Sequence, residues 1–341
     1  MDTRTAVTRT AATHNSVTGT AVTRTPRRSR TLALAAGAAL ALLVGCGSSS
    51  AETDTASQAG SPVASAASGF PVTVDSANGP LTLDERPERI VSLSPTATES
   101  LFAVGAGEQV VAVDDQSDFP AEAPASDLSG FTPNAEAVAG YEPDLVVVSD
   151  DLGGIVDALT TLEIPVLVQP AVTSVEQAWA QIEALGDATG QTDQAGALVD
   201  ELQERFADAV ASVPAEAQGL SVFHELDASL YTATSGTFVG SVEAALGLVN
   251  VADGVVPGND YPQLSAEYLV KAGPEVVVLA DTTCCGESAE TFAARPGFAA
   301  LPAVVEGRVV EVEDALASRW GPRLVDFAEQ LAAALGGTPS R

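Results

Sequence analysis

Two adjacent cysteines are the most unusual residues of this chain that could do chemistry. Cys284 and Cys285 follow a short apolar run, and the chain has one further cysteine, Cys46. Neighbouring thiols can close into a disulfide, stay free, or offer two ligands to a soft metal ion. An oxidising compartment favours the disulfide, and no nearby histidine or third cysteine completes a zinc shell. We therefore predict a disulfide, with neither a metal site nor a cofactor, and keep the other two states as alternatives.

Two arginines flank a tryptophan near the C-terminus, at Arg319, Trp320 and Arg323. Guanidinium groups bind carboxylate or phosphate oxygens, so they could hold an anionic ligand or neutralise neighbouring acids. Aromatic residues could wall a flat ligand or belong to the core. Ligands of open α/β sheets lie beyond the carboxyl ends of the strands. The ligand-binding residues predicted on this basis are Ser94, Pro95, Phe119, Phe131, Asp150, Tyr261, Cys284, Cys285, Arg319, Trp320 and Arg323.

The elements that position these residues follow from hydrophobic patterning. A hairpin is predicted around Asn78-Gly79, and strands then alternate with helices, as in doubly wound parallel sheets. Between 174 and 213 the helical spacing continues for longer than a connection between neighbouring strands requires. The sequence predicts an α/β fold with two doubly wound lobes, 70–173 and 214–341. A long rigid linking helix (174–213) joins them, and the ligand cleft lies between the lobes.

The first 69 residues look like an export signal and a tether. Arginines precede an apolar run at 32–44, which is too short to span a bilayer comfortably but suits a secretory signal. Leu43-Val44-Gly45-Cys46 resembles the bacterial lipobox, so residues 1–45 are predicted to be a lipoprotein signal peptide and Cys46 to carry the lipid. Residues 46–69 are rich in Ala, Ser, Thr and Gly and are predicted to be a flexible tether. The expected location is extracytoplasmic, anchored to the cell membrane.

The charge balance excludes some partners. The chain has 15 basic and 46 acidic residues, and six of its arginines lie within the first 45 residues. The remainder is strongly acidic, so it would repel nucleic acid and anionic lipid surfaces. A solvated acidic coat that supports solubility is the simplest interpretation of this charge.

Segments 89–99, 134–146 and 261–277 together carry a family resemblance that spans roughly 70–337. They resemble the helix-linked (class III) periplasmic binding proteins of ABC importers for ferric siderophores, haem and cobalamin. The resemblance implies capture of a chelate and its delivery to a permease dimer. It also implies that Glu136 and Glu267, one in each lobe, dock on permease arginines. From the residues alone, both could be ordinary first-turn glutamates favoured by the helix dipole.

The expected function is that of a monomeric substrate-binding lipoprotein and not an enzyme. No Gly-rich phosphate loop or nucleophile elbow is present, although a metallocluster or chelatase-like enzyme on a related fold is the alternative of a different class. A ferric siderophore is the first ligand choice, cobalamin the second and haem the third. His224, the single histidine after the leader, is expected to be structural, with haem binding as its alternative.

Overall fold

The computed structural model describes residues 69–336, so the predicted signal peptide, Cys46 and nearly all of the tether lie outside the described residues. The described part begins with an antiparallel pair, β1 (Val72–Val74) and β2 (Leu81–Leu83), in which Thr73 lies opposite Thr82. Gly79 in the connecting turn has a φ of +112°, a conformation that glycine adopts without strain. The hairpin predicted around Asn78-Gly79 is confirmed.

Two parallel sheets of four strands follow, and both have the same topology. The first sheet has the order β4-β3-β5-β6 and the second the order β10-β9-β7-β8, so each is 2-1-3-4 when its strands are counted along the chain. The strands are β3 (Ile90–Leu93), β4 (Val110–Val113), β5 (Leu145–Val148), β6 (Val166–Val168), β7 (Ser221–Glu225), β8 (Val249–Asn250), β9 (Val276–Leu279) and β10 (Val309–Glu311). The predicted pair of doubly wound α/β lobes is confirmed. The two-residue strand β8 was not predicted from the sequence.

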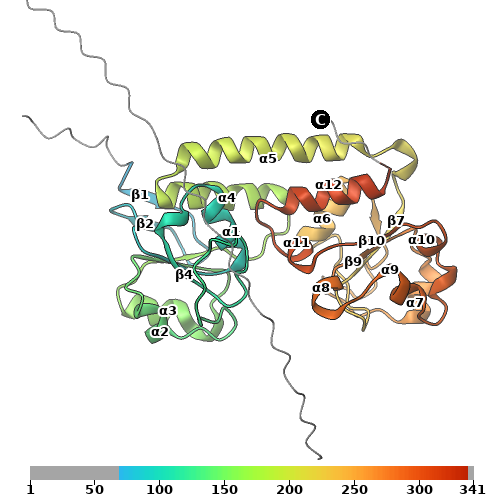
Figure 1. Cartoon of the computed structure of the whole chain (residues 1–341), viewed down its shortest axis with the longest axis horizontal. Helices are drawn as coiled ribbons and strands as arrows, with labels where there is room; N and C mark the ends of the chain where they lie inside the picture. Colours follow the sequence, from blue (N-terminus) through green and yellow to red (C-terminus); the bar gives the residue numbers. More distant parts are fainter. Residues whose placement is uncertain (1–68, 337–341) are drawn as a thin grey trace, which may run out of the picture. The chain divides into compact units, whose positions relative to one another are not determined.

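Helices connect the strands in both lobes (Figure 1). In the first lobe they are α1 (Pro95–Ala103), η1 (Gly107–Gln109), α2 (Ala135–Ala139), η2 (Leu152–Gly154) and α3 (Ile155–Thr161). In the second lobe they are η3 (Ala215–Ala217), α6 (Phe238–Ala245), α7 (Ala266–Ala272), α8 (Thr282–Cys285), α9 (Ala289–Ala293), η4 (Phe298–Ala300), α10 (Pro302–Val305), α11 (Asp314–Ser318) and α12 (Leu324–Ala334).

The prediction of a single linking helix over 174–213 is wrong, because the range contains two helices. α4 (Val175–Thr189) ends at Gly190, whose φ of +71° is left-handed, and α5 (Thr192–Ser212) begins two residues later. The two helices pack closely because Gly186 has no side chain, and a Cβ at that position would collide with Ala195. α4 contacts α1 and β1, whereas α5 contacts α4 and α12. The lobes are therefore connected by a packed helix pair.

The core is continuous through this connection. The largest buried cluster includes Leu101 of α1, Trp179 of α4, Leu202 of α5 and Phe327 of α12. Arg205 of α5 adds ion pairs to Asp326 and Glu329 of α12. Among residues 69–336, no helix combines the length and apolar character that a bilayer span needs. A shared core of this kind resists independent movement of the two lobes.

Candidate functional site

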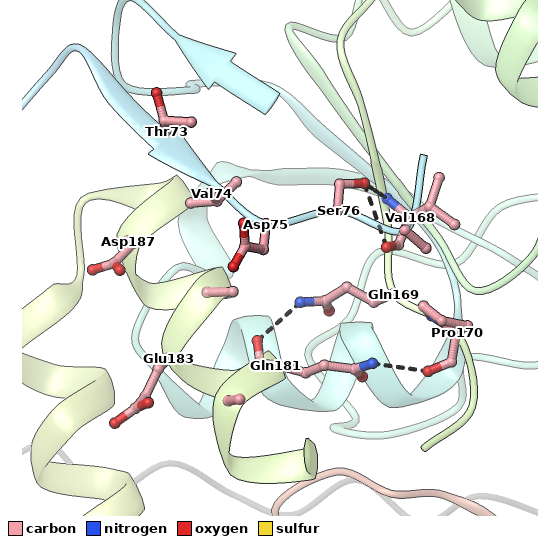
Figure 2. Close-up of a pocket in the computed structure, with 13 residues that line it drawn as sticks. Thr73, Val74, Asp75, Ser76, Val168, Gln169, Pro170, Gln181, Glu183 and Asp187 are labelled. Atoms are coloured by element: carbon pink, nitrogen blue, oxygen red, sulfur yellow. Dashed lines mark hydrogen bonds between the residues drawn. The ribbon is translucent and has the colours of Figure 1, made fainter. Parts of the chain in front are cut away.

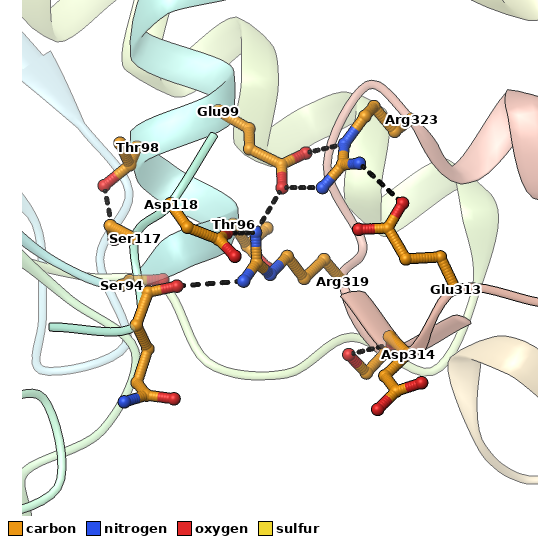
Figure 3. A network of polar contacts seen from close by, with 12 residues as sticks. Ser94, Thr96, Thr98, Glu99, Ser117, Asp118, Glu313, Asp314, Arg319 and Arg323 are labelled. Carbon is orange, nitrogen blue, oxygen red and sulfur yellow. Dashed lines mark hydrogen bonds and ion pairs between the residues drawn. The ribbon is translucent and has the colours of Figure 1, made fainter. Parts of the chain in front are cut away.

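A buried carboxylate from one lobe is held by two arginines from the other. The Glu99 side chain on α1 is 1% exposed. Its Oε1 accepts hydrogen bonds from Arg319 at 2.9 Å and from Arg323 at 2.7 Å, and its Oε2 accepts from Arg323 Nε at 2.9 Å. Figure 3 shows Glu99 between the two guanidinium groups. Buried charges of opposite sign in bidentate geometry form strong contacts, so this cluster ties the lobes together.

Each arginine has further partners. Arg319 donates to the Asp118 carboxylate and to the Gln116 carbonyl, both at 2.9 Å. Arg323 lies over the Phe119 ring, 4.2 Å from its centroid, and 3.8 Å from a Glu313 oxygen. The hydrogen bond to Glu99 is the main reason that the pKa of Arg323 is raised above its ordinary value, against the effect of burial. Of the two interpretations left open by the sequence, neutralisation of neighbouring acids is the one observed.

Local sequence places Glu99 where it can meet these arginines. Ser94 is the N-cap of α1 and accepts from the Ala97 N–H, while Pro95 occupies the first turn, where its fixed φ suits a helix start. The second turn of α1 carries Glu99 into the interface. Arg319 directly follows α11 and Arg323 directly precedes α12, so both arginines come from one short connection.

Trp320 lies in the same connection and contacts the linking helix α4. Its Nε1 donates to Gln181 Oε1 of α4 at 2.8 Å, and its ring stands edge-on to Phe238 at 6.4 Å. It packs against the large core cluster. The sequence predicted Trp320 as a cleft wall, and the structure places it in the packing between α4 and α6.

The remaining predicted ligand residues differ in their exposure and in their partners. Phe119 is 43% exposed and touches Arg323, whereas Phe131 is 71% exposed and Tyr261 is 53% exposed. Burial of part of the Tyr261 phenol, with the neighbouring Asp260 charge, raises its pKa. Asp150 is exposed at the end of β5. Ser94 is buried as a helix cap, so its hydroxyl already has a partner.

The cysteine loop is tied to the segment that precedes the arginines. Cys284 and Cys285 are joined by a vicinal disulfide, at the end of the one-turn helix α8. The Asp314 carboxylate, in the first turn of α11, accepts from the Thr283 and Cys284 N–H groups at 2.8 and 2.7 Å. The loop after β9 therefore contacts the helix that leads into Arg319.

A cavity among the described residues lies elsewhere, on the first lobe. It measures about 510 Å³ and lies between β1, the end of β6 and α4. Figure 2 shows Gln169 donating to the Gln181 carbonyl and Gln181 donating to the Pro170 carbonyl. The charged residues that line this cavity are Asp75, Glu183 and Asp187. These acidic residues give the cavity a negative lining that would repel an anionic ligand. The predicted ligand residues Phe119, Arg319 and Arg323 lie together elsewhere, so we take the face around the two arginines as the candidate site.

Two groups of residues were missed from the sequence. The residues on either side of Glu99 in α1 are all buried. An acidic residue within a buried segment indicates that it has a buried partner. The second group is Glu225, Asp281 and Glu287, with Arg295 beside them. Burial raises the pKa of Glu225 to about 7, although Arg295 opposes that rise. The sequence feature that could have indicated this group is the acidic residue at the carboxyl end of β7 and the one just beyond β9.

We predict that Glu99→Gln destabilises the protein far more than Asp118→Asn. Both changes remove one negative charge from Arg319, but Glu99 is 1% exposed and Asp118 is 72% exposed. Loss of the buried partner should lower the free energy of unfolding by about 3 kcal/mol or more, and loss of the exposed partner by less than about 1 kcal/mol. Urea unfolding of both variants measures the difference. Equal losses would mean that Glu99 is not the anchor of the cluster.

The comparisons with known proteins agree with this architecture. The profile of the family described as "Periplasmic binding protein" matches residues 90–316. An ABC transporter substrate-binding lipoprotein of Bacillus subtilis, YvrC, is 30% identical over 304 residues, which are 86% of this chain and 93% of that protein. A cobalamin-binding protein of Halobacterium salinarum is 32% identical over 284 residues, covering 79% of this chain and 75% of that protein.

A solved structure supports the same assignment. A protein of Staphylococcus epidermidis, described as a possible iron-binding, periplasmic solute-binding protein, superposes with a TM-score of 0.64 at 25% identity. The match covers 73% of this chain and 99% of that chain. The duplicated 2-1-3-4 sheets, the helical connection and the matched profile lead to one conclusion: this chain belongs to the periplasmic binding protein family, the substrate-binding components of ABC importers.

Proposed function

We propose that this protein captures a corrinoid of the cobalamin type and delivers it to an ABC permease. Its role as a substrate-binding component follows from the family. The corrinoid is our choice among the family's chelates, and one structural observation carries it: the cations near the site already have partners. Cobalamin offers mainly neutral amide groups on a corrin ring, and such a ligand needs few free cations. The name of the Halobacterium relative supports the same choice.

The pairing of cations extends through the described part of the chain. Of its eight lysine and arginine residues, all but Lys271 donate to a carboxylate or to a carbonyl oxygen; the seven are Arg86, Arg89, Arg205, Arg295, Arg308, Arg319 and Arg323. An anionic ferric siderophore would have to break the contacts of Glu99 to reach Arg319 and Arg323. That competition moves the siderophore from our first choice to our second.

Haem is disfavoured by the position of the histidine. His224 is fully buried, and its Nδ1 lies 2.8 Å from Glu243 Oε1. Its ring packs edge-on to Phe327 of α12. A histidine that coordinates haem must be able to reach the iron. His224 is buried, so we interpret it as a structural residue. Exposed Phe119 and Tyr261 offer apolar surface that suits the flat ring of a corrinoid.

The corrinoid proposal is tested by calorimetric titration of the mature protein with cyanocobalamin, haemin and a panel of ferric siderophores. We expect saturable one-to-one binding of cyanocobalamin. Trp320→Phe, which removes the hydrogen bond to Gln181, should weaken binding about tenfold by loosening the contact between α4 and the arginine connection. Trp179→Phe, in the core of α4, is the matched control. Tight binding of a siderophore without any binding of cyanocobalamin would overturn the proposal.

We propose that Glu136 and Glu267 dock the protein on its permease. Both glutamates are exposed in the first turn of short helices, α2 and α7. Asn134 and Ser265 are the N-caps of these helices, so the two lobes present their glutamates from equivalent local structures. Two carboxylates on lobes that share a core form a two-point charge match that favours one register on the partner. The helix-dipole role is compatible with this one.

The docking proposal predicts a separation of binding from transport. Glu136→Arg with Glu267→Arg should reduce uptake at least about a hundredfold, because two attractive contacts become repulsive, while ligand affinity stays within about twofold. The control is Glu201→Arg with Glu290→Arg, which makes the same charge change at exposed positions on α5 and α9. Uptake by whole cells and calorimetry of the purified proteins provide the two readouts. A loss of ligand affinity in the docking variant would contradict this assignment.

We propose that Cys46 anchors the mature protein through a lipid. The lipobox-like Leu43-Val44-Gly45-Cys46 motivates the proposal, and the Bacillus relative is named a lipoprotein. Cys46→Ser should move the protein from the membrane fraction to the soluble fraction, because the acyl chains hold what the cleaved peptide no longer spans. Immunoblots of both fractions measure this. A variant that stays in the membrane through residues 32–44 would contradict lipidation.

A further inference from the structure

Three carboxylates converge at the centre of the carboxyl edge of the second sheet. Glu225 ends β7 and Asp281 lies two residues beyond β9, and these two strands are parallel neighbours. Glu287 follows α8 and reaches the same point. One oxygen from each side chain lies within 4.8 Å of the others. The place where strand order reverses, between β7 and β9, is where open α/β sheets leave a crevice for ligands.

One arginine neutralises part of this charge. Arg295 donates to Glu225 Oε2 at 2.8 Å and contacts Glu287 Oε1 at 3.0 Å. Its guanidinium also lies over the rings of Phe292 and Phe298, 5.0 and 5.8 Å from their centroids, so its position is well supported. When all three carboxylates are ionised, one guanidinium leaves two negative charges uncompensated. No second cationic side chain among the described residues contacts the cluster.

Asp281 is the carboxylate of this cluster that has no hydrogen-bond partner among the described residues. The residue is fully buried, and neither of its carboxylate oxygens makes a hydrogen bond within residues 69–336. A buried carboxylate of this kind is costly to keep unless a proton or a cation satisfies it. Its oxygens face Glu225 and Glu287, whose remaining lone pairs are free to bind because each carboxylate oxygen accepts twice.

We infer that Glu225, Asp281 and Glu287 bind a divalent cation, and that this cation is calcium. The donors are all carboxylate oxygens, which hard cations prefer, and no sulfur or imidazole donor belongs to the cluster. Calcium binds oxygens at about 2.3–2.6 Å, so two of its ligands can lie up to roughly 5 Å apart, as these do. Its two charges match the uncompensated charge. Water completes the coordination shell.

Calcium at this point would stabilise the loop between Asp281 and Glu287. That loop contains α8 with the Cys284–Cys285 disulfide, and it contacts Asp314 of α11. The bound ion therefore supports the surface that leads into Arg319 and Arg323. The inference does not depend on which chelate the protein transports, since the cluster is complete within the second lobe.

The test is calcium binding by the mature protein after treatment with EDTA and removal of the chelator. Calorimetric titration with calcium chloride should show one saturable site, and calcium should raise the melting temperature. Asp281→Asn should weaken binding about tenfold or more and remove the thermal shift. Glu290→Gln, an exposed neighbour on α9 with the same change in charge, should bind as the unmodified protein does.

Several results would overturn the inference. If a proton occupies Asp281, the unmodified protein will show no saturable heat up to about 10 mM calcium, above the weakest affinities of extracellular calcium sites. Equal affinity for magnesium would contradict the choice of ion. If Asp281→Asn does not fold, Glu287→Gln replaces it, because that side chain is 12% exposed and better tolerates substitution. Unchanged binding in Glu287→Gln would exclude the cluster, and cobalamin titration of the same samples tests the transport proposal separately.

Discussion

The burial of Glu99 between Arg319 and Arg323 is the interaction on which the relation between the two lobes depends. A charged carboxylate that is 1% exposed is costly to leave without a cation, so the segment that supplies the arginines is held against α1. Trp320 and Gln181 make a second contact from the same segment. Together with the core shared through α4, α5 and α12, these contacts favour one arrangement of the lobes over an ensemble of hinged ones.

The same ion pairs restrict what the face around Arg319 and Arg323 can recognise. Arginines that neutralise Glu99, Asp118 and Glu313 have little capacity left for an anionic ligand. Recognition would then rest on shape, aromatic surface and hydrogen bonds to neutral groups, which is the pattern expected for small-molecule sites. In a chain this acidic, the scarce cations act first as structural partners. This is the physical reason for preferring a corrinoid over an anionic iron chelate.

The two sheets show how a duplicated topology places different chemistry at equivalent points. Both have the order 2-1-3-4, and both end their first and third strands at the point where strand order reverses. In the first lobe this point carries Ser94 and Ser149, whereas in the second lobe it carries Glu225 and Asp281. Glu136 and Glu267 again come from equivalent short helices, α2 and α7. A common scaffold thus presents similar exposed glutamates from both lobes and a polar edge that differs between the lobes.

The sequence by itself determined the strands other than β8, most of the helices and the two-lobed class, because buried parallel strands are apolar runs and helical faces have a 3.6-residue period. Segments such as 110–113 and 145–148 needed no tertiary information. It also singled out Arg319 and Arg323, since basic residues are few. It did not show that α4 and α5 fold back on each other, because the packing of Gly186 against Ala195 is a contact between helices.

Tertiary structure alone decided how the charged residues are paired. Glu99 and Arg323 are separated by more than two hundred residues, and no local pattern indicates which acid an arginine will meet. The same holds for Glu225, Asp281 and Glu287, which become neighbours only when β7 and β9 lie side by side. Electrostatic contacts depend on distance in space and on burial, and neither is a property of sequence spacing.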